Sequence, residues 1–480
     1  MARERHLAFR LYSSHVRMAG LDIAIHPMII SFVLVFVLAV ALTLHARKGH
    51  DMADPRAFFA ARGQLGTLLY FMLAVGETYS IGTVLGFPAG IAAHGTMVAL
   101  WFVGYILLAF PVGYVLYPRL WEAGRRTGAI TLPDLFRSHF GSRALERLVT
   151  CILLVLMLPL GAMQFIGLSD VMAHLAPAVP TMAATGAAGA VTFGFVLVAG
   201  LRAPATVAIL KDALMLCTIA AVAASAGLHW THATSGSMQA AFGQNHPISA
   251  RDLCFVISTI MVQSVAFCIA PQSAAAVFSA RDPASIRRAQ IAMPLYMVLF
   301  PLLFLIAGFA VTHGIGPANN AFLGSANLLL PDWAFGIVLA ATALTAIVWL
   351  GAVCLSIAAL VARNLFPGLD RDVQKRVGLT TIAGYLVLSI LGAAFRNSLL
   401  TDLNTLFYLA LVQLVPSVLA LVRNQRPSVP SVMLGLAGGL SVAMLLRSAS
   451  WTTYGVNPGL IGVLVNAAIL RVTGRVATSN

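Results

Sequence analysis

Charged residues are scarce in this sequence. Asp, Glu, Lys and Arg make up 10% of the 480 residues, whereas a soluble protein needs about a quarter to cover its surface. Hydrophobic residues make up 59%, and the mean hydropathy is +0.89. This composition excludes a soluble enzyme, a secreted disulfide-stabilised domain and a nucleic-acid-binding protein, and it predicts an integral membrane protein.

Cysteine is scarce as well. The five cysteines all lie inside apolar runs, and none has the paired spacing of a metal site or a redox motif. We interpret them as small core residues. The sequence also lacks a phosphate-binding glycine loop and a Ser, His and Asp arrangement at one depth, so we expect neither an enzyme nor a bound cofactor.

Long apolar runs dominate what is present. A bilayer crossing requires about 20 such residues. Thirteen runs are close to or above this length: 21–45, 64–93, 96–118, 148–175, 180–201, 205–228, 251–278, 289–313, 333–362, 378–395, 400–422, 428–446 and 455–472. The sequence therefore predicts an all-α integral membrane protein with about 13 transmembrane helices.

The basic residues set the expected orientation. Of the 30 Lys and Arg residues, 23 lie at the C-terminus or in loops after odd-numbered spans, if Lys211 is counted with its neighbouring loop. Cytoplasmic loops retain positive charge, so we expect the N-terminus outside, the C-terminus in the cytoplasm and the chain in the bacterial plasma membrane. The net charge of +14 would then face anionic lipid headgroups rather than a nucleic acid.

The first residues contradict this orientation. Residues 1–17 carry four arginines that would have to cross the membrane. Our hypothesis is that Met18 is the true start of the chain. Residues 1–20 lack an apolar core followed by a small-residue cleavage site, so the first span is the expected insertion signal.

Two loops carry further information. Residues 122–147 are predicted to lie inside and to include a short amphipathic helix that begins at Thr131 and Pro133. Residues 229–250 are predicted to lie outside and contain three histidines. These histidines have no carboxylate or cysteine partner, so we interpret them as solvated loop residues rather than metal ligands.

The second span contains polar residues and helix breakers at mid-depth. They are Gly76, Glu77, Thr78, Tyr79 and Ser80, followed by Gly82, Gly86, Pro88 and Gly90. The glycine spacing alone is typical of a helix-packing face, but packing does not require a carboxylate. A broken helix provides flexible backbone, freed carbonyls and side-chain oxygens that ligate a cation, and we favour this interpretation.

The seventh span has a similar pattern. It carries Gln263 and Ser264 at mid-depth, and Pro271, Gln272 and Ser273 toward the cytoplasmic end, so we predict a second broken helix. The two broken spans stand five helices apart and enter the membrane in opposite directions by the charge count. Matching broken helices in two inverted halves are typical of a secondary transporter with its site at the midplane.

Other polar residues lie within the spans. Gln164 in the fourth span supports a polar cavity, and Asp212 lies beside Lys211 near the cytoplasmic start of the sixth span. Two interpretations of the Lys211 and Asp212 pair stay open: an interfacial pair with a lysine that extends to the headgroups, or a role on an ion exit path. We assign Tyr105 to an interfacial aromatic belt.

Four segments resemble the sodium:solute symporters, whose bacterial members carry proline, monocarboxylates, pantothenate or sugars. The segments are FFAARG at 58–63, GFPAG at 86–90, TLPDLFRSHFGS at 131–142 and PQSAAAVFSARD at 271–282. The resemblance covers residues 55–365 and implies the LeuT-type fold, with two inverted five-helix repeats, flanking helices and alternating access around a central solute site.

The resemblance and the spans together imply five parts. They are an N-terminal segment with the first transmembrane helix (1–63), a first five-helix repeat (64–228), an outside loop (229–250), a second five-helix repeat (251–422) and C-terminal transmembrane helices (423–480).

The resemblance also implies site residues. Gly76 and Tyr79 would supply backbone ligands to the cation, and Asp212 matches an acidic residue that helps the cation leave inward and that follows a threonine in the family. Lys211 replaces that threonine. The candidate solute-binding residues are Glu77, Thr78, Ser80, Gln164, Gln263 and Ser264, and the candidate ion-coupling residues are Gly76, Glu77, Tyr79, Asp212 and Thr345.

Two departures from the family bear on coupling. The family's ninth span gives sodium a pair of hydroxyl ligands, but the matching residues here are Val348 and Trp349, and only Thr345 offers a hydroxyl one turn earlier. Glu77 is an additional carboxylate. Burial favours its neutral form, which makes it a candidate proton carrier; alternatively it stays ionised and ligates sodium or pairs with a cationic solute.

We therefore predict a secondary active symporter that moves a small polar organic solute, with a small carboxylate or an amino acid favoured, into the cell. A sodium or proton gradient would drive it. The expected partners are the solute, the coupling cation and the lipid bilayer, and no nucleic acid. The alternative is a transporter-like substrate sensor without coupled transport, and a third possibility is a passive channel.

Overall fold

The computed structural model describes residues 26–47, 66–199, 202–231, 249–316, 320–394, 400–449 and 454–473. All the regular elements of these segments are helices. The hypothesis about Met18, the FFAARG segment at 58–63 and most of the predicted outside loop fall outside the described residues.

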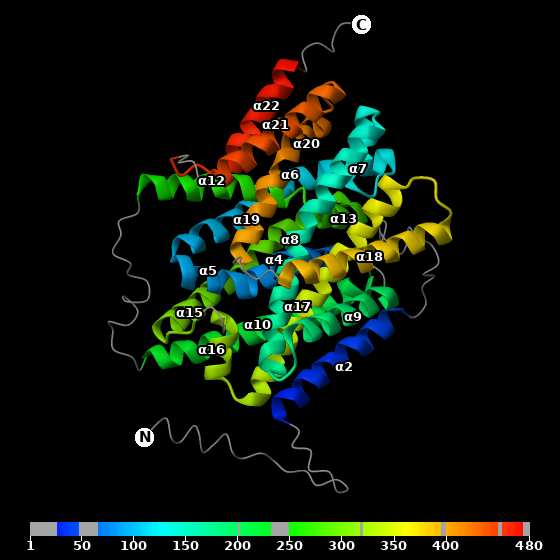
Figure 1. Ribbon diagram of the computed structural model, residues 1–480. Helices are drawn as coiled ribbons and strands as arrows, with labels where there is room; N and C mark the ends of the chain where they lie inside the picture. Colours follow the sequence, from blue (N-terminus) through cyan, green and yellow to red (C-terminus); the bar gives the residue numbers. More distant parts are fainter. Residues whose placement is uncertain are drawn as a thin grey trace.

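The helices follow one another along the chain and are drawn in Figure 1. The first half contains α2 (Pro27–Arg47), α4 (Thr67–Thr78), η1 (Gly82–Gly86), α5 (Phe87–His94), α6 (Met97–Thr127), α7 (Leu132–Phe140), α8 (Arg143–Leu175), α9 (Thr181–Ala199) and α10 (Arg202–Thr231). The second half contains α12 (Ala250–Phe267), α13 (Pro271–Ser279), α14 (Pro283–Ala292), η2 (Met293–Val298), α15 (Leu299–Thr312), α16 (Ala321–Leu329), α17 (Asp332–Ala359), η4 (Leu360–Leu365), α18 (Arg371–Ala394), α19 (Leu400–Leu411), η5 (Val412–Leu414), α20 (Val415–Val422), α21 (Val429–Ser448) and α22 (Pro458–Thr473).

The predicted fold class, an all-helical membrane protein, is confirmed. Within the described residues, 11 helices are long and apolar enough to cross a membrane. Two shorter apolar helices, Thr181–Leu197 and Pro458–Thr473, lie where two more spans were expected. The exact count of thirteen and the boundaries of the five parts stay predictions.

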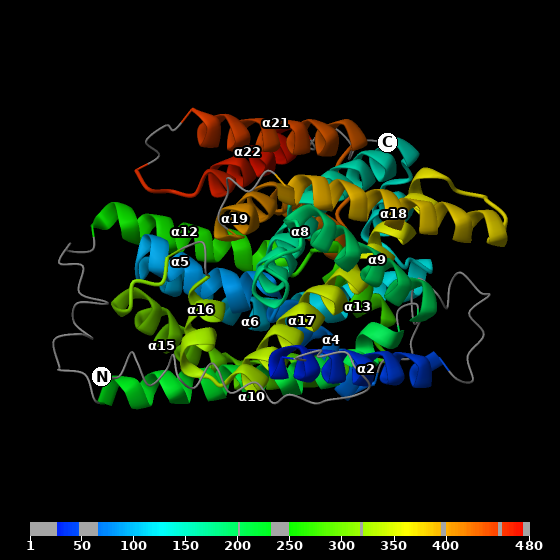
Figure 2. The ribbon, with the colours of Figure 1, turned by 60° about the horizontal axis from the view of Figure 1, so that its bottom comes forward.

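One helix forms the centre of the bundle. In α17, 89% of the most apolar window is buried inside the protein, whereas the corresponding share of α2 is 11%. Figure 2 shows α17 in the interior and α2 along one edge, and Figure 1 shows α21 and α22 as a pair on the opposite side. A central helix that contacts protein on all sides positions residues for a site, while a peripheral one faces lipid.

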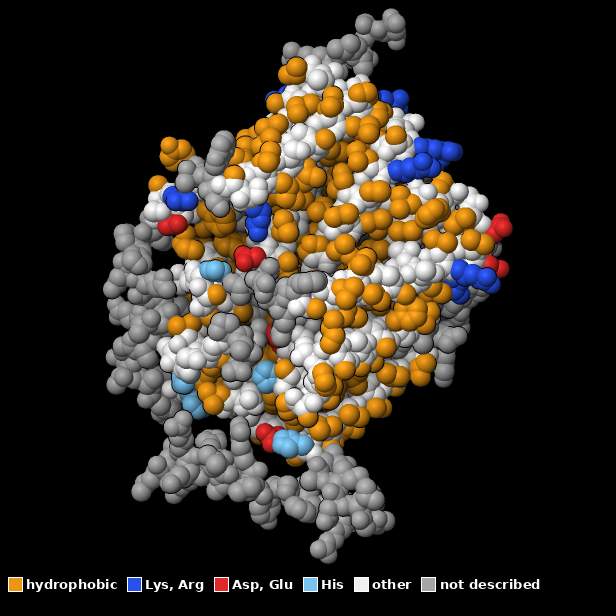
Figure 3. Space-filling model, viewed as in Figure 1, with side chains coloured by type: hydrophobic (Ala, Val, Ile, Leu, Met, Phe, Trp, Pro, Cys, Tyr) orange, Lys and Arg blue, Asp and Glu red, His pale blue; other side chains and the backbone are white. Residues whose placement is uncertain are grey.

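The surface is consistent with a bilayer environment. Hydrophobic side chains are spread widely over the face in Figure 3, and Lys and Arg lie mainly toward its upper, right and left parts. Exposed leucines such as Leu34 and Leu295 are 63% and 75% exposed. Such a surface is not stable in water, but lipid tails solvate it.

The short helix α7 forms as the sequence predicts. The Thr131 side chain accepts from the Asp134 N–H at 3.3 Å, the Asp134 carboxylate accepts from the Thr131 N–H at 3.2 Å, and Pro133 lies in the first turn. This reciprocal cap satisfies backbone donors that would otherwise lack partners.

A polar network joins α7 to η4, the segment that follows α17, and to α8. Asp134 accepts from Arg363 Nε at 2.8 Å and from Asn364 Nδ2 at 2.7 Å. Asn364 Nδ2 also donates to Glu146 Oε1 at 2.9 Å, and its Oδ1 accepts from Thr131 Oγ1 at 2.9 Å. Asn364 is 1% exposed and lies at the centre of the network.

Asn364→Ala tests this network. The substitution removes a donor from the buried Glu146 carboxylate and from the partly buried Asp134 carboxylate, and an acceptor from the buried Thr131 hydroxyl. Each buried group left unsatisfied costs about 1–3 kcal/mol. We expect a lower Tm for the purified protein in detergent. Thr380→Ala is the control, because its hydroxyl bonds an exposed carbonyl of its own helix. Equal Tm values for the two variants would contradict a stabilising role.

Candidate functional site

The second span breaks where the sequence predicts, but over a shorter stretch. Helix α4 continues through Thr78, and the backbone leaves helical geometry at Tyr79, with φ −100° and ψ 70°. The last helical bond of α4 runs from the Tyr79 N–H to the Val75 carbonyl, at 2.9 Å. The carbonyls of residues 76–78 therefore have no successor within α4 to bond them, and that of Thr78 accepts instead from the Thr83 hydroxyl at 2.5 Å.

The glycines after the break have different surroundings. A Cβ at Gly86 or Gly90 would lie 3.1 Å or 2.8 Å from side chains of α19, so these two glycines form a close packing face. A Cβ at Gly82 would instead lie 3.1 Å from Met163 of α8. The packing interpretation holds for the first two, whereas Gly82 lies beside the break.

The seventh span is also broken. Helix α12 ends at Phe267 and α13 begins at Pro271. The Ser273 hydroxyl lies within hydrogen-bonding distance of the Phe267 carbonyl, at 3.0 Å, and of the Glu77 carboxylate. A single side chain thus joins the break between α12 and α13 to the end of α4.

Three small cavities lie near this contact. The central cavity, of about 20 Å³, is lined by Glu77, Thr78, Ser80, Gly82, Thr83, Phe102, Tyr105, Leu160, Met163, Phe267, Gln272, Trp349, Asn404 and Tyr408. A second cavity, of about 30 Å³, shares Glu77, Gln272 and Trp349 with the first. A third, of about 10 Å³, shares Ala275 and Ser356 with the second and reaches Leu132 of α7. Glu77 therefore lies on the wall that the central and second cavities share.

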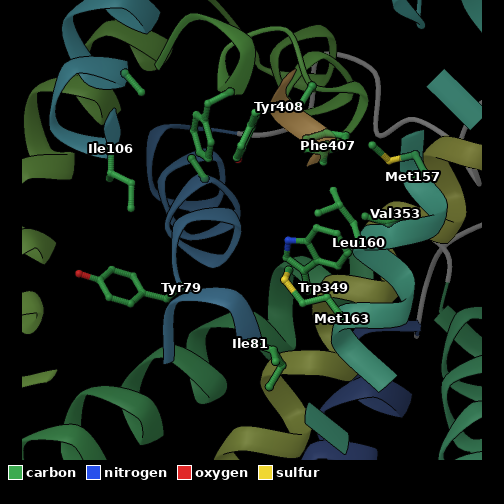
Figure 4. Packing of buried hydrophobic residues seen from close by; sticks show 14 of the residues in the cluster. Tyr79, Ile81, Ile106, Met157, Leu160, Met163, Trp349, Val353, Phe407 and Tyr408 are labelled. Atoms are coloured by element: carbon green, nitrogen blue, oxygen red, sulfur yellow. The ribbon is translucent and has the colours of Figure 1, made fainter. Parts of the chain in front are cut away.

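The apolar wall of the central cavity comes from α8 and α17. Figure 4 shows Trp349 beside Met163 and Leu160, while Tyr79 points away from them on the other side of the broken span. The Tyr79 hydroxyl donates to the Tyr296 carbonyl. The Tyr79 side chain thus takes no part in the cavity wall.

The predicted solute-binding residues fall into two groups. Glu77, Thr78 and Ser80 line the central cavity. Gln164 and Gln263 line none of the three cavities in this conformation, although both are buried and both of their amides have no hydrogen-bond partner among the described residues. Ser264 is likewise buried away from the cavities and donates to the Met261 carbonyl at 3.2 Å.

The predicted ion-coupling residues are also divided. Gly76 and Glu77 line the second cavity. Thr345 is absent from all three cavities and donates to the Ala341 carbonyl at 2.8 Å. The residues of α17 that face the second cavity are Val348 and Trp349, followed by Ala352, Val353 and Ser356. The wall opposite α4 is therefore apolar where the family has two hydroxyls.

The Lys211 and Asp212 pair is buried rather than interfacial. Lys211 Nζ lies 2.6 Å from Asp212 Oδ1, and the two residues are 1% and 4% exposed. A lysine that extends to the headgroups would be exposed at its tip. The structure therefore rejects the interfacial interpretation, and the role of Asp212 in ion exit stays a proposal.

Sequence analysis missed several lining residues, among them Asn404, Tyr408 and Tyr105. Asn404 of α19 is buried, and its Nδ2 has no hydrogen-bond partner among the described residues. Tyr408 lies one turn further on, and its ring is 5.6 Å from that of Tyr105. Tyr105 is 4% exposed, so its assignment to an aromatic belt was wrong. An amide inside an apolar run was the available signal for Asn404.

Two broken spans that meet at a polar cavity within an all-helical membrane protein define a secondary transporter. Residues 58–423 match the sodium:solute symporter family. The chain belongs to the sodium:solute symporter family, as the motifs predicted, and membership implies Na⁺ as the coupling ion.

Curated relatives cover nearly the whole chain. An uncharacterized symporter, YhjB, of Bacillus subtilis (strain 168) is 26% identical over 472 residues, which are 91% of this chain and 94% of the relative. A monocarboxylate transport permease protein of Rhizobium johnstonii is 25% identical over 475 residues, which are 91% of this chain and 94% of the relative.

Solved structures agree on the fold. A Na⁺-coupled sialic acid symporter in a substrate-bound outward-open state has a TM-score of 0.75 at 11% identity, over 94% of this chain and 98% of that one. Mhp1, a nucleobase-cation-symport-1 family transporter, has a TM-score of 0.52 at 14% identity, over 89% and 96%. The predicted LeuT-type fold is thus confirmed.

Gly82→Val tests whether the central cavity holds the solute. The added methyl groups would meet Met163 and reduce a cavity of about 20 Å³. Overpacking costs about 1–3 kcal/mol, so we expect solute affinity to fall by about tenfold or more. The measurement is concentration-dependent uptake into proteoliposomes.

The matched control is Gly186→Val on α9, because nothing lies within 4 Å of a Cβ at that position. An unchanged affinity in Gly82→Val, with normal expression, would place the solute elsewhere.

Proposed function

We propose that this symporter imports a small polar organic solute by alternating access, and that a small carboxylate is the favoured solute class. The observation that carries the proposal is the central cavity between the two breaks. It combines an apolar wall of Leu160, Met163 and Trp349 with two polar atoms, Asn404 Nδ2 and Gln272 Oε1, that have no hydrogen-bond partner among the described residues, as small-molecule sites do.

The polar side of the cavity suits a carboxylate. Asn404 Nδ2 is a buried donor without a partner among the described residues. The N-terminal end of α13 lies beside the cavity through Gln272, and a half-helix N-terminus attracts an anionic group. The name of the Rhizobium johnstonii relative, a monocarboxylate permease, agrees with this class.

Glu77 favours an amino acid as the second solute class. Its carboxylate lines the same cavity and offers an acceptor to a substrate ammonium group. A monocarboxylate without an amine would meet an ionised Glu77 unfavourably, and it would bind best to the protonated form. Solute class and the charge of Glu77 are therefore linked.

The direction of transport and the membrane are also part of the proposal. We propose import across a bacterial plasma membrane, with the N-terminus outside and the C-terminus in the cytoplasm, because basic residues concentrate in alternate loops. Gly76, Tyr79 and Asp212 are the proposed ion-coupling residues, and Glu77, Thr78 and Ser80 are proposed to contact the solute.

Uptake into proteoliposomes tests the function. Labelled acetate, pyruvate, proline and pantothenate are supplied outside, with a sodium or a proton gradient imposed separately. We expect saturable accumulation of pyruvate or acetate under an inward cation gradient, and competition by unlabelled carboxylate.

Empty liposomes and liposomes with a collapsed gradient are the controls. Accumulation of proline alone would move the solute class to amino acids. Flux that never exceeds the equilibrium level under any gradient would contradict symport and favour a sensor or a channel.

A further inference from the structure

The outer face of α14 carries two arginines without acidic partners. Arg287 and Arg288 are both exposed, and neither forms a salt bridge among the described residues. By contrast, Arg137 and Arg363 near α7 each have a carboxylate partner, at 3.6 Å and 2.8 Å. Positive charge that no acidic residue compensates attracts an anionic ligand.

An aromatic ring of α6 orients one of these arginines. The Arg287 guanidinium lies over the ring of Tyr114, 5.8 Å from its centroid. Tyr114 is 40% exposed, so the pair lies at the protein surface. A guanidinium stacked on a ring keeps the N–H donors along its edge, and their planar arrangement matches the oxygens of a phosphate.

A second pair of this kind lies further along α6. The Arg125 guanidinium is 5.2 Å from the centroid of the Trp121 ring, and Trp121 Nε1 donates to the Ala280 carbonyl at 2.9 Å. On α6, Trp121 follows Tyr114 by seven residues and shares its face of the helix. Ala280 precedes Arg287 by seven residues, so the two segments run antiparallel. Both pairs therefore lie along one seam between α6 and α14.

Acidic residues do not neutralise this seam. The Asp282 carboxylate caps α14 and accepts from the Ser285 N–H at 2.7 Å and from the Ser285 hydroxyl at 3.1 Å. Glu122 is exposed on α6 and forms no salt bridge among the described residues. The basic residues outnumber these two acids and are Arg125, Arg281, Arg287 and Arg288.

An apolar strip begins where the two arginines of α14 end. Ile291 follows Arg287 by one turn, and Leu295 follows Ile291 by one more. Ile291, Leu295 and Val298 are 68%, 75% and 62% exposed. A phospholipid has the matching chemistry, because its anionic phosphate is joined to hydrocarbon chains that cover apolar surface. A small soluble anion would leave the strip uncovered.

Helix α14 also connects the two broken spans. It follows α13 directly, through residues 280–282. The Thr67 hydroxyl at the start of α4 donates to Ser285 Oγ at 3.2 Å, and α14 packs on both α4 and α6. Because α4 and α13 each have their other end at a break, a ligand that fixes α14 restrains both half-helices.

We propose that the seam between α6 and α14 binds one anionic phospholipid and that the bound lipid restrains α4 through α14. The phosphate lies at Arg287 and Arg288, and an acyl chain lies along Ile291 and Leu295. The proposal does not depend on which solute the protein carries.

Thermal unfolding of the purified protein in a neutral detergent is the first test. Phosphatidylglycerol should raise the Tm of the wild type saturably, because a ligand that binds the folded state stabilises it. Phosphatidylcholine should raise the Tm much less, because its choline cation meets the arginines. An equal rise with both lipids would overturn the proposal.

The double substitution Arg287→Gln and Arg288→Gln tests the location. Basic residues near a membrane surface contribute strongly to the binding of anionic lipid. The phosphatidylglycerol concentration that gives half of the maximal stabilisation should therefore increase about tenfold or more. A wild-type Tm without added lipid would show that the variant folds.

The matched control is the double substitution Arg447→Gln and Arg471→Gln. It removes two exposed arginines of α21 and α22 that form no salt bridge among the described residues. This control should respond to phosphatidylglycerol as the wild type does. The same lipid response in both double variants would refute the location.

A water-soluble phosphate ester separates a lipid from a free anion. Glycerol 3-phosphate carries the same phosphate without acyl chains, so it should not raise the Tm at concentrations where phosphatidylglycerol is saturating. A rise as large as that with the lipid would show that the apolar strip takes no part, and would overturn the proposal.

Hydrogen–deuterium exchange tests the restraint on α4. Phosphatidylglycerol should slow amide exchange in α14 and in the first turns of α4 in the wild type, but in neither segment of the Arg287→Gln and Arg288→Gln variant. Slowing confined to α14 would contradict the restraint. These measurements need no solute, so they test lipid binding whether or not the proposed transport is observed.

Discussion

The contact between Glu77 and Ser273 is where the two interrupted spans meet, and the rest of the site is arranged around it. A helix that stops inside a bilayer exposes backbone groups that lipid cannot satisfy, so it must stop against protein or a cavity. Here each break meets the other. The buried helix α17 and its neighbours α8 and α19 then close the space around the breaks.

Acidic groups outnumber basic ones near this meeting point. Glu77 and Asp212 are two carboxylates, Lys211 is one ammonium, and the end of α4 adds partial negative charge. Because the surrounding wall is apolar, small changes of protonation have large effects on which groups attract one another.

The sequence predicted the elements that are marked by local chemistry. Glycine, proline and polar residues inside apolar runs revealed both breaks, and Thr131 with Asp134 revealed α7, because caps and breakers act on their own backbone. It could not predict which face of a long helix turns inward. Asn404 and Tyr105 were missed for this reason, since uniformly apolar helices show no periodicity that orients them.

The sequence did not predict the burial of the Lys211 and Asp212 pair either. A lysine near a predicted helix start is normally extended toward the headgroups, and only the arrangement of α4 against α10 shows otherwise. The lack of hydroxyls at Val348 and Trp349 was visible in the sequence, but the burial of Lys211 and Asp212 on α10 required the structure.

The polar network around Asn364 has a thermodynamic consequence for the packing of α7 against its neighbours. Its groups exchange a protein partner for water at a net cost of only about 0.5–1.5 kcal/mol per hydrogen bond. A seal made of apolar side chains would instead lose about 25 cal/mol for each Å² that separates. The groups of this network can be hydrated once their protein partners are removed, whereas the apolar side chains of such a seal cannot.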